Sequence, residues 1–150
     1  MTDNMTEFKN ALVFHQAGRP IEAVPLYEAA LAANPEDIEA LVNLGALRSA
    51  QGELRIASEL YAKVLEITPD NVTALINYAN LCQRQGAHAE AAQSYSHAVE
   101  LAPNIATAHA GLGNALLSLS QFQEAINCFR RSLQISPENA GIYNNMGSAH

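Results

Sequence analysis

Residues 40–71 read ALVNLGALRSAQGELRIASELYAKVLEITPDN, and this stretch decides the fold. Two segments with apolar residues at helical spacing lie on either side of Gly52, and Pro69 stands near the end. A glycine tolerates the positive φ that ends a helix, and a proline cannot continue one. The stretch therefore predicts a helix, a short turn and a second helix.

The same pattern recurs every 34 residues, which is the signature of a repeat protein. The recurring prolines are Pro35, Pro69, Pro103 and Pro137. An alanine stands twelve residues before each of them, at Ala23, Ala57, Ala91 and Ala125, and an aromatic follows four residues later, at Tyr27, Tyr61, Tyr95 and Phe129. Counted from 31 residues before each proline, the repeats span 4–37, 38–71, 72–105 and 106–139, with a partial fifth at 140–150.

Small residues recur at position eight of the repeats, at Ala11, Gly45, Ala79, Gly113 and Gly147. Together with the alanines at position twenty, they allow two helix backbones to approach closely. We therefore expect the position-24 aromatics to be buried, together with the small residues Ala23, Ala57, Ala91, Ala125, Gly45, Ala79 and Gly113.

These positions resemble the tetratricopeptide repeat, and the resemblance covers residues 4–150. It implies one all-α domain, a right-handed α-solenoid of nine helices in which four full repeats are followed by the first helix of a fifth. The chain departs from the family at position four, where His109 and other residues replace a tryptophan. It departs again at position eleven, where Arg48 replaces an aromatic.

The helix ends carry local signals of their own. Gly18, Gly52 and Gly86 stand between the two helices of their repeats, where the fourth repeat has Ser120. Pro20 suits a first helical turn, whereas Pro25 is expected to bend its helix slightly. The residues expected to cap first helices are Asp37, Asn71, Asn104 and Asn139, with a capping box formed by Asn4 and Glu7.

Composition excludes several functions. The net charge of −7 opposes binding to nucleic acid or to an anionic membrane. No signal peptide or membrane-spanning stretch is evident, which predicts a cytoplasmic protein, and six Arg against two Lys hint at a bacterial source. Cys82 and Cys128 are interpreted as packing residues. The five histidines form no ligand set and no catalytic motif is present, so we predict neither a metal, a cofactor nor an enzyme.

The family resemblance implies a binding site in the concave groove, lined by the first helices. The residues at its groove positions are Asn43, Asn77, Asn80, Gln83, Arg84, Asn114 and Asn145. A side-chain amide both donates and accepts hydrogen bonds, so such an array could pair with the backbone of an extended peptide. The alternative is that these amides satisfy neighbouring backbone groups or simply face water.

Two known uses of the family bear on function. The asparagines resemble the ladder in the superhelix of O-linked N-acetylglucosamine transferases, although Lys9 and Gly111 interrupt it. The carboxylate clamp of chaperone-binding members is absent, because only Asn43 of its positions matches. We therefore predict a protein-interaction module or scaffold. The alternative is the substrate-recognition arm of a larger glycosyltransferase whose catalytic domain lies beyond residue 150.

The last helix is expected to lack its partner, which predicts that the chain is an N-terminal fragment of a longer protein. Tyr143, Met146 and Gly147 would then leave apolar surface in water. We therefore expect self-association through residues 140–150, or fraying there.

Overall fold

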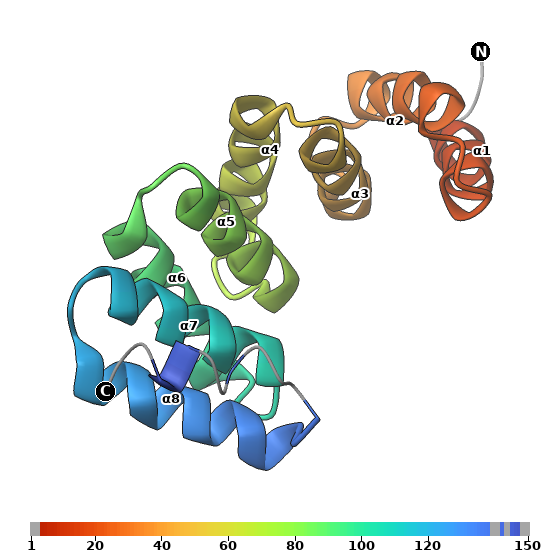
Figure 1. The fold of residues 1–150 in the computed structure, drawn as a ribbon. Helices are drawn as coiled ribbons and strands as arrows, with labels where there is room; N and C mark the ends of the chain where they lie inside the picture. Colours follow the sequence, from red (N-terminus) through yellow and green to blue (C-terminus); the bar gives the residue numbers. More distant parts are fainter. Residues whose placement is uncertain (1–3, 139–141, 143–144, 148–150) are drawn as a thin grey trace. The chain divides into compact units, whose positions relative to one another are not determined.

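The computed structural model describes residues 4–138, 142 and 145–147, and no strand occurs among them (Figure 1). Eight helices have defined bounds: α1 (Asn4–Gln16), α2 (Pro20–Ala33), α3 (Ile38–Ala50), α4 (Leu54–Ile67), α5 (Val72–Arg84), α6 (His88–Leu101), α7 (Ala106–Ser118) and α8 (Phe122–Ile135). They form two compact units, Met1–Pro69 with α1 to α4 and Asp70–His150 with α5 to α8. We call these the N-terminal and the C-terminal unit.

Each full repeat is a helical hairpin, as predicted. The first helix of each has 13 residues and the second has 14. Within each unit, consecutive helices pack against one another. Of the predicted ninth helix, residues 142 and 145–147 are described and are helical. The rest of 140–150 lies outside the described residues.

The turns between paired helices require a left-handed residue. Gly18, Gly52 and Gly86 have φ values of 69°, 81° and 79°. Ser120 takes the same conformation, with φ of 61°, although it carries a side chain. Its amide donates to the carbonyl of Leu117 at 3.0 Å, just as the amide of Gly52 donates to that of Ser49. The turn geometry is therefore kept in the fourth repeat at a conformational cost.

Two of the predicted caps are confirmed and one is wrong. The side chains of Asp37 and Asn71 accept from the amides of Ala40 and Ala74, at 3.1 and 2.9 Å. Asn104 does not cap α7, because the residue at the cap position is Ile105. Asn104 stands one residue too early and instead accepts from Arg131 at 3.5 Å. Asn139 and the side chain of Asn4 lie outside what the structure describes.

The prolines of the first repeat occupy one helix. Pro20 is the first residue of α2, as predicted. Pro25 lies inside the same helix, which continues to Ala33 without interruption. The slight bend expected there stays a prediction.

The predicted core is confirmed in both units. The alanines at position twenty are fully buried, and the four aromatics at position 24 are at most 2% exposed. Gly45, Ala79 and Gly113 are buried as well. In the C-terminal unit, Ile142 joins the cluster formed by Ala125 and Phe129, and Met146 packs against it.

Three of the four aromatics at position 24 pack against a glycine of a neighbouring helix. A β-carbon added at Gly45 would lie 2.9 Å from the ring of Tyr61, and one at Gly113 would lie 2.5 Å from Phe129. In the third repeat, position eight is Ala79, and Tyr95 instead lies against Gly111 of the next repeat. A missing side chain thus makes room for each of these three rings, in the same repeat or the following one.

Two buried polar groups of the fourth repeat are satisfied by backbone carbonyls. Nε2 of His109, which replaces the family tryptophan, hydrogen-bonds to the carbonyl of Pro103 at 2.8 Å. The fully buried Ser132 donates from its hydroxyl to the carbonyl of Ala106 at 2.7 Å. Both acceptors lie at or just before the start of α7. The two bonds avoid the cost of burying a polar group without a partner.

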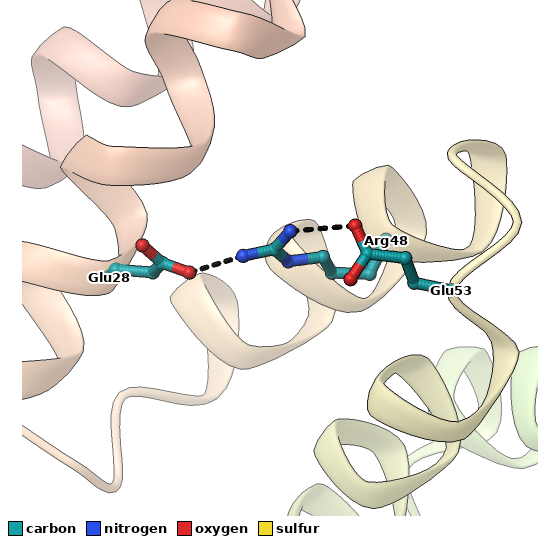
Figure 2. A network of polar contacts seen from close by, with 3 residues as sticks. All are labelled: Glu28, Arg48 and Glu53. Carbon is teal, nitrogen blue, oxygen red and sulfur yellow. Dashed lines mark hydrogen bonds and ion pairs between the residues drawn. The ribbon is translucent and has the colours of Figure 1, made fainter.

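Arg48 replaces the position-eleven aromatic with an ionic link between the first two repeats (Figure 2). Its guanidinium donates to Glu53 in the following turn at 2.9 Å and to Glu28 on α2. Burial alone would lower the pKa of Arg48, but the hydrogen bonds to Glu28 and Glu53 outweigh it and raise this pKa above its usual value. The charge is therefore held in a half-buried position by two carboxylates.

Candidate functional site

The predicted binding residues of the C-terminal unit lie on its first helices. Helices α5 and α7 contact each other, and α5 carries Asn77, Asn80, Gln83 and Arg84. Asn80 and Arg84 are exposed, whereas Asn77 and Gln83 are half-buried. Residues three apart on a helix share a face, so Asn77, Asn80 and Gln83 line one side of α5.

Asn80 is held by the second helix of its own hairpin. The hydroxyl of Tyr95 donates to Oδ1 of Asn80. The ring of Tyr95 reaches this position across Gly111, where a β-carbon would lie 2.4 Å from its Cζ atom. The glycine that interrupts the asparagine ladder therefore makes room for the tyrosine that bonds Asn80 in the preceding repeat. Burial raises the pKa of Tyr95 to about 12, which keeps this hydroxyl protonated.

Asn114 and Asn145 form a direct amide pair. Nδ2 of Asn145 donates to Oδ1 of Asn114 at 2.7 Å, and both side chains are half-buried. Asn114 follows Gly111 by three residues on α7, so Tyr95 and Asn114 lie on the same side of that helix. The structure thus brings Asn114 and Asn145 together, and the tyrosine that bonds Asn80 lies against Gly111, three residues before Asn114. That these residues form a binding surface stays a prediction.

Gln83 is oriented by the start of α6. Nδ1 of His88 lies 3.4 Å from Oε1 of Gln83, which fits a histidine that carries its proton on Nδ1. We call Asn80, Gln83, Asn114 and Asn145 the amide face. Each oxygen of its first three amides is engaged by another side chain of the protein.

Asn43 lies in the N-terminal unit and has a different partner. It is half-buried on α3 and hydrogen-bonds the hydroxyl of Tyr27, which also lies 3.0 Å from Nδ1 of His15. Burial raises the pKa of Tyr27, and the bond from Asn43 opposes that shift. A neighbouring side chain therefore engages Asn43, an arrangement that neither the ligand-binding interpretation nor its alternative had predicted.

The tyrosines are the polar partners that the sequence interpretation missed. It assigned Tyr27 and Tyr95 to the core as aromatics, and their rings are indeed buried. Their hydroxyls, however, reach first-helix amides. The usable signal was Gly111, because a glycine at an asparagine position leaves space for a long side chain from the preceding hairpin.

The cysteines behave as packing residues. Cys82 is buried and Cys128 is half-buried, and burial raises the pKa of both thiols. A raised pKa keeps a thiol protonated and unreactive. Among the described residues, no three His, Cys, Asp or Glu side chains gather as a metal site would need. None of the helices in this part of the chain is long and apolar enough to cross a membrane.

Family models now identify the repeat. A tetratricopeptide repeat model matches residues 36–104 and again 70–138, and a second one matches residues 8–54. The chain belongs to the tetratricopeptide repeat family. The predicted fold class, an all-α solenoid of tetratricopeptide hairpins, is thereby confirmed.

Solved structures with this tetratricopeptide fold include two of MamA. The crystal structure of MamA protein has a TM-score of 0.91 at 20% identity, covering 97% of this chain and 80% of that one. MamA 41-end from Desulfovibrio magneticus RS-1 also has a TM-score of 0.91, at 21% identity, covering 99% of this chain and 85% of that one. YrrB, described as a TPR protein with an unusual peptide-binding site, has a TM-score of 0.90 at 19% identity, over 98% of this chain and 76% of its own. No curated protein matches the sequence.

Proposed function

We propose that this protein is a peptide-binding interaction module, with a cytoplasmic scaffold or adaptor role. The observation that carries the proposal is the amide face, in which Asn145 bonds to Asn114 and Asn80 bonds to Tyr95, whose ring lies against Gly111 of α7. Membership of the tetratricopeptide family and the likeness to YrrB, a protein with a described peptide-binding site, support it.

The amide face suits an extended peptide. Side chains fixed by neighbours lose little conformational freedom when a ligand binds, so the cost of ordering them is already met within the fold. Asn80 and Asn114 occupy the same repeat position on α5 and α7, so each can bond to the backbone at a different point of the ligand. The alternative, an arm of a larger glycosyltransferase, stays a prediction.

Peptides selected from a displayed random 12-residue library provide the test. We expect Asn114→Ala to weaken their binding by about five-fold or more, because it removes an amide that is directed at the ligand. Asn127→Ala on α8 is the matched control, since Asn127 is exposed on a second helix. Fluorescence anisotropy measures affinity, and circular dichroism checks that both variants fold. Equal affinity of parent and Asn114→Ala for every selected peptide would place binding elsewhere.

A further inference from the structure

Helix α2 exposes an apolar stripe along one of its faces. Its four members recur at a spacing of four or three residues, and every one is exposed: Ile21, Pro25, Ala29 and Ala32. The residues on the opposite side of the helix are fully buried in the N-terminal unit: Ala23, Tyr27 and Ala30. We call the four exposed residues the α2 stripe. Ile21 is its largest member, and it is 81% exposed.

Among the four second helices, only α2 has this stripe. Ile21, Pro25 and Ala29 occupy positions 18, 22 and 26 of their repeat. In the second helices of the later repeats the same positions hold mostly polar side chains, which are Arg55, Glu59 and Lys63, then Ala89, Gln93 and His97, then Gln123, Asn127 and Arg131. Hairpin packing therefore does not require apolar residues at these positions. An exposed apolar face that the fold does not need is typical of an interaction surface.

Two carboxylates border the α2 stripe, one on each side. Glu22 and Glu28 lie three residues before and after Pro25, which places them on opposite edges of the stripe. Glu22 accepts from Arg19 at 2.7 Å, and Glu28 accepts from Arg48 (Figure 2). The side chains of the two glutamates stay 39% and 50% exposed, and a carboxylate has acceptor sites for more than one donor group. The first repeat as a whole has five Asp or Glu residues against two Lys or Arg, so the stripe has acidic surroundings.

We propose that the α2 stripe docks an amphipathic helix of a partner protein, one whose own apolar stripe is bordered by Lys or Arg residues. A ridge of side chains at a spacing of four residues fits the groove of a second helix, and the small residues Ala29 and Ala32 allow close approach. Basic residues beside the partner's stripe would meet Glu22 and Glu28, as charged residues do across the seam of a coiled coil. The net charge of −7 attracts such a partner.

The acidic borders disfavour two other occupants of the stripe. A second copy of this chain would bring the same glutamates against each other, because a two-fold interface uses the same patch on both copies. An anionic membrane would repel the glutamates as well. The α2 stripe belongs to the N-terminal unit and the amide face to the C-terminal unit, so this inference does not depend on the proposed function.

A displayed library of 21-residue helical peptides provides the probe. Every member carries the same stripe of Leu and Ala at a spacing of four residues, and the positions on either side of that stripe are randomised. Selection is done on the full chain, and fluorescence anisotropy measures the affinity of the enriched peptides. We expect Lys and Arg to be enriched on both sides of the stripe. The affinity of these peptides should fall about three-fold or more as the ionic strength is raised from about 0.05 M to about 0.5 M.

Variants separate the apolar from the acidic contribution. Ile21→Gln should weaken binding about five-fold or more, because the complex buries this side chain. Val13→Gln on α1, at a 64% exposed apolar site outside the stripe, is the matched control and should bind as the parent does. Glu22→Gln should weaken binding about two-fold or more, whereas Glu59→Gln, which likewise removes the partner of an exposed arginine, should not. Circular dichroism checks that all four variants fold.

The inference is overturned if no peptide with basic borders is enriched, or if the parent and Ile21→Gln bind the enriched peptides equally. Peptides that lose affinity for Asn114→Ala but not for Ile21→Gln would bind the amide face, which overturns this inference and leaves the proposed function in place. Light scattering and sedimentation with anionic vesicles test the other occupants. Dimers or vesicle binding that Ile21→Gln abolishes would assign the stripe to a second copy or to a membrane instead.

Discussion

Gly113 lies where α7 comes closest to the fully buried ring of Phe129 on α8. Gly45 has the same relation to Tyr61 in the second repeat. At this distance the space between two helices is already filled by an aromatic ring. A single methyl group therefore has to displace the ring or separate the helices.

We predict that Gly113→Ala destabilises the fold by about 1–2 kcal/mol, since an overpacking cost of about 1–3 kcal/mol exceeds the helix propensity gained from alanine. Gly147→Ala is the control, because a β-carbon there would meet nothing within 4 Å. It should leave stability unchanged or raise it by up to about 1 kcal/mol. Urea unfolding followed by circular dichroism measures both, and equal stability of Gly113→Ala and parent would contradict the close packing.

Tyr95 gives a prediction about alkaline pH. Its pKa is about 12 in the folded chain, whereas the ordinary value is 10.0. The unfolded chain releases this proton first, so the stability linked to Tyr95 is present below pH 10 and is lost between pH 10 and 12, by about 2 kcal/mol. Tyr95→Phe should be less stable than the parent at pH 8 and should lose less stability on going to pH 11. Urea unfolding at both values decides, and parallel losses in the two chains would refute the assignment.

At the scale of the helix, the ion pair between Arg48 and Glu28 differs in exposure from the ion pair between Arg55 and Glu59. The Arg48 side chain is 19% exposed and its Glu28 partner 50%. The Arg55–Glu59 pair within α4 is 83% and 63% exposed. Because screening by water weakens exposed pairs, the two should differ in strength.

A double-mutant cycle with Arg48→Met and Glu28→Gln should give a coupling energy of about 1 kcal/mol. The matching cycle with Arg55→Met and Glu59→Gln should give less than about 0.5 kcal/mol. Unfolding in urea at low salt supplies the four free energies of each cycle. A coupling for Arg48 no larger than that of the control would mean that α2 and α3 are held by apolar packing alone.

Helix ends show how far local sequence signals extend. The sequence predicted each glycine turn because a residue with positive φ is needed at that point. Ser120 shows that the repeat can impose the same conformation on another residue. The cap of α7 was misread because an asparagine one position early cannot reach the helix amides. A cap depends on a single position, whereas a repeat frame averages over many.

For the whole molecule, self-association through residues 140–150 stays a prediction, and most of that segment lies outside the described residues. Within it, Ile142 is buried and Met146 is half-buried against the cluster of Phe129. Any apolar surface left there favours a second copy by about 25 cal/mol per Å² buried. Light scattering over a concentration series should show mass increasing in the parent and less so in Met146→Glu. Ile21→Glu, at an 81% exposed site on α2, is the control, and a parent that stays monomeric contradicts the idea.

By itself, the sequence determined the repeat frame, the helical hairpins and the buried positions. These follow from a period of 34 residues, because every repeat must present small and aromatic residues at the same places for neighbouring hairpins to pack. The frame also placed Asn114 and Asn145 at positions whose side chains meet. Such predictions are well supported because the same residue type recurs at the same position in several repeats, and a wrong frame would lose this agreement in all of them.

Only the tertiary structure decided which side chains the amides contact. Asparagine donates and accepts equally well, so its letter in the sequence names no partner. Tyr95 hydrogen-bonds Asn80, and it reaches that residue only because Gly111 lacks a side chain. Arg48 likewise found its partner Glu28 on another repeat. Each of these choices depends on a contact between residues far apart in the chain, which periodicity along the chain cannot specify.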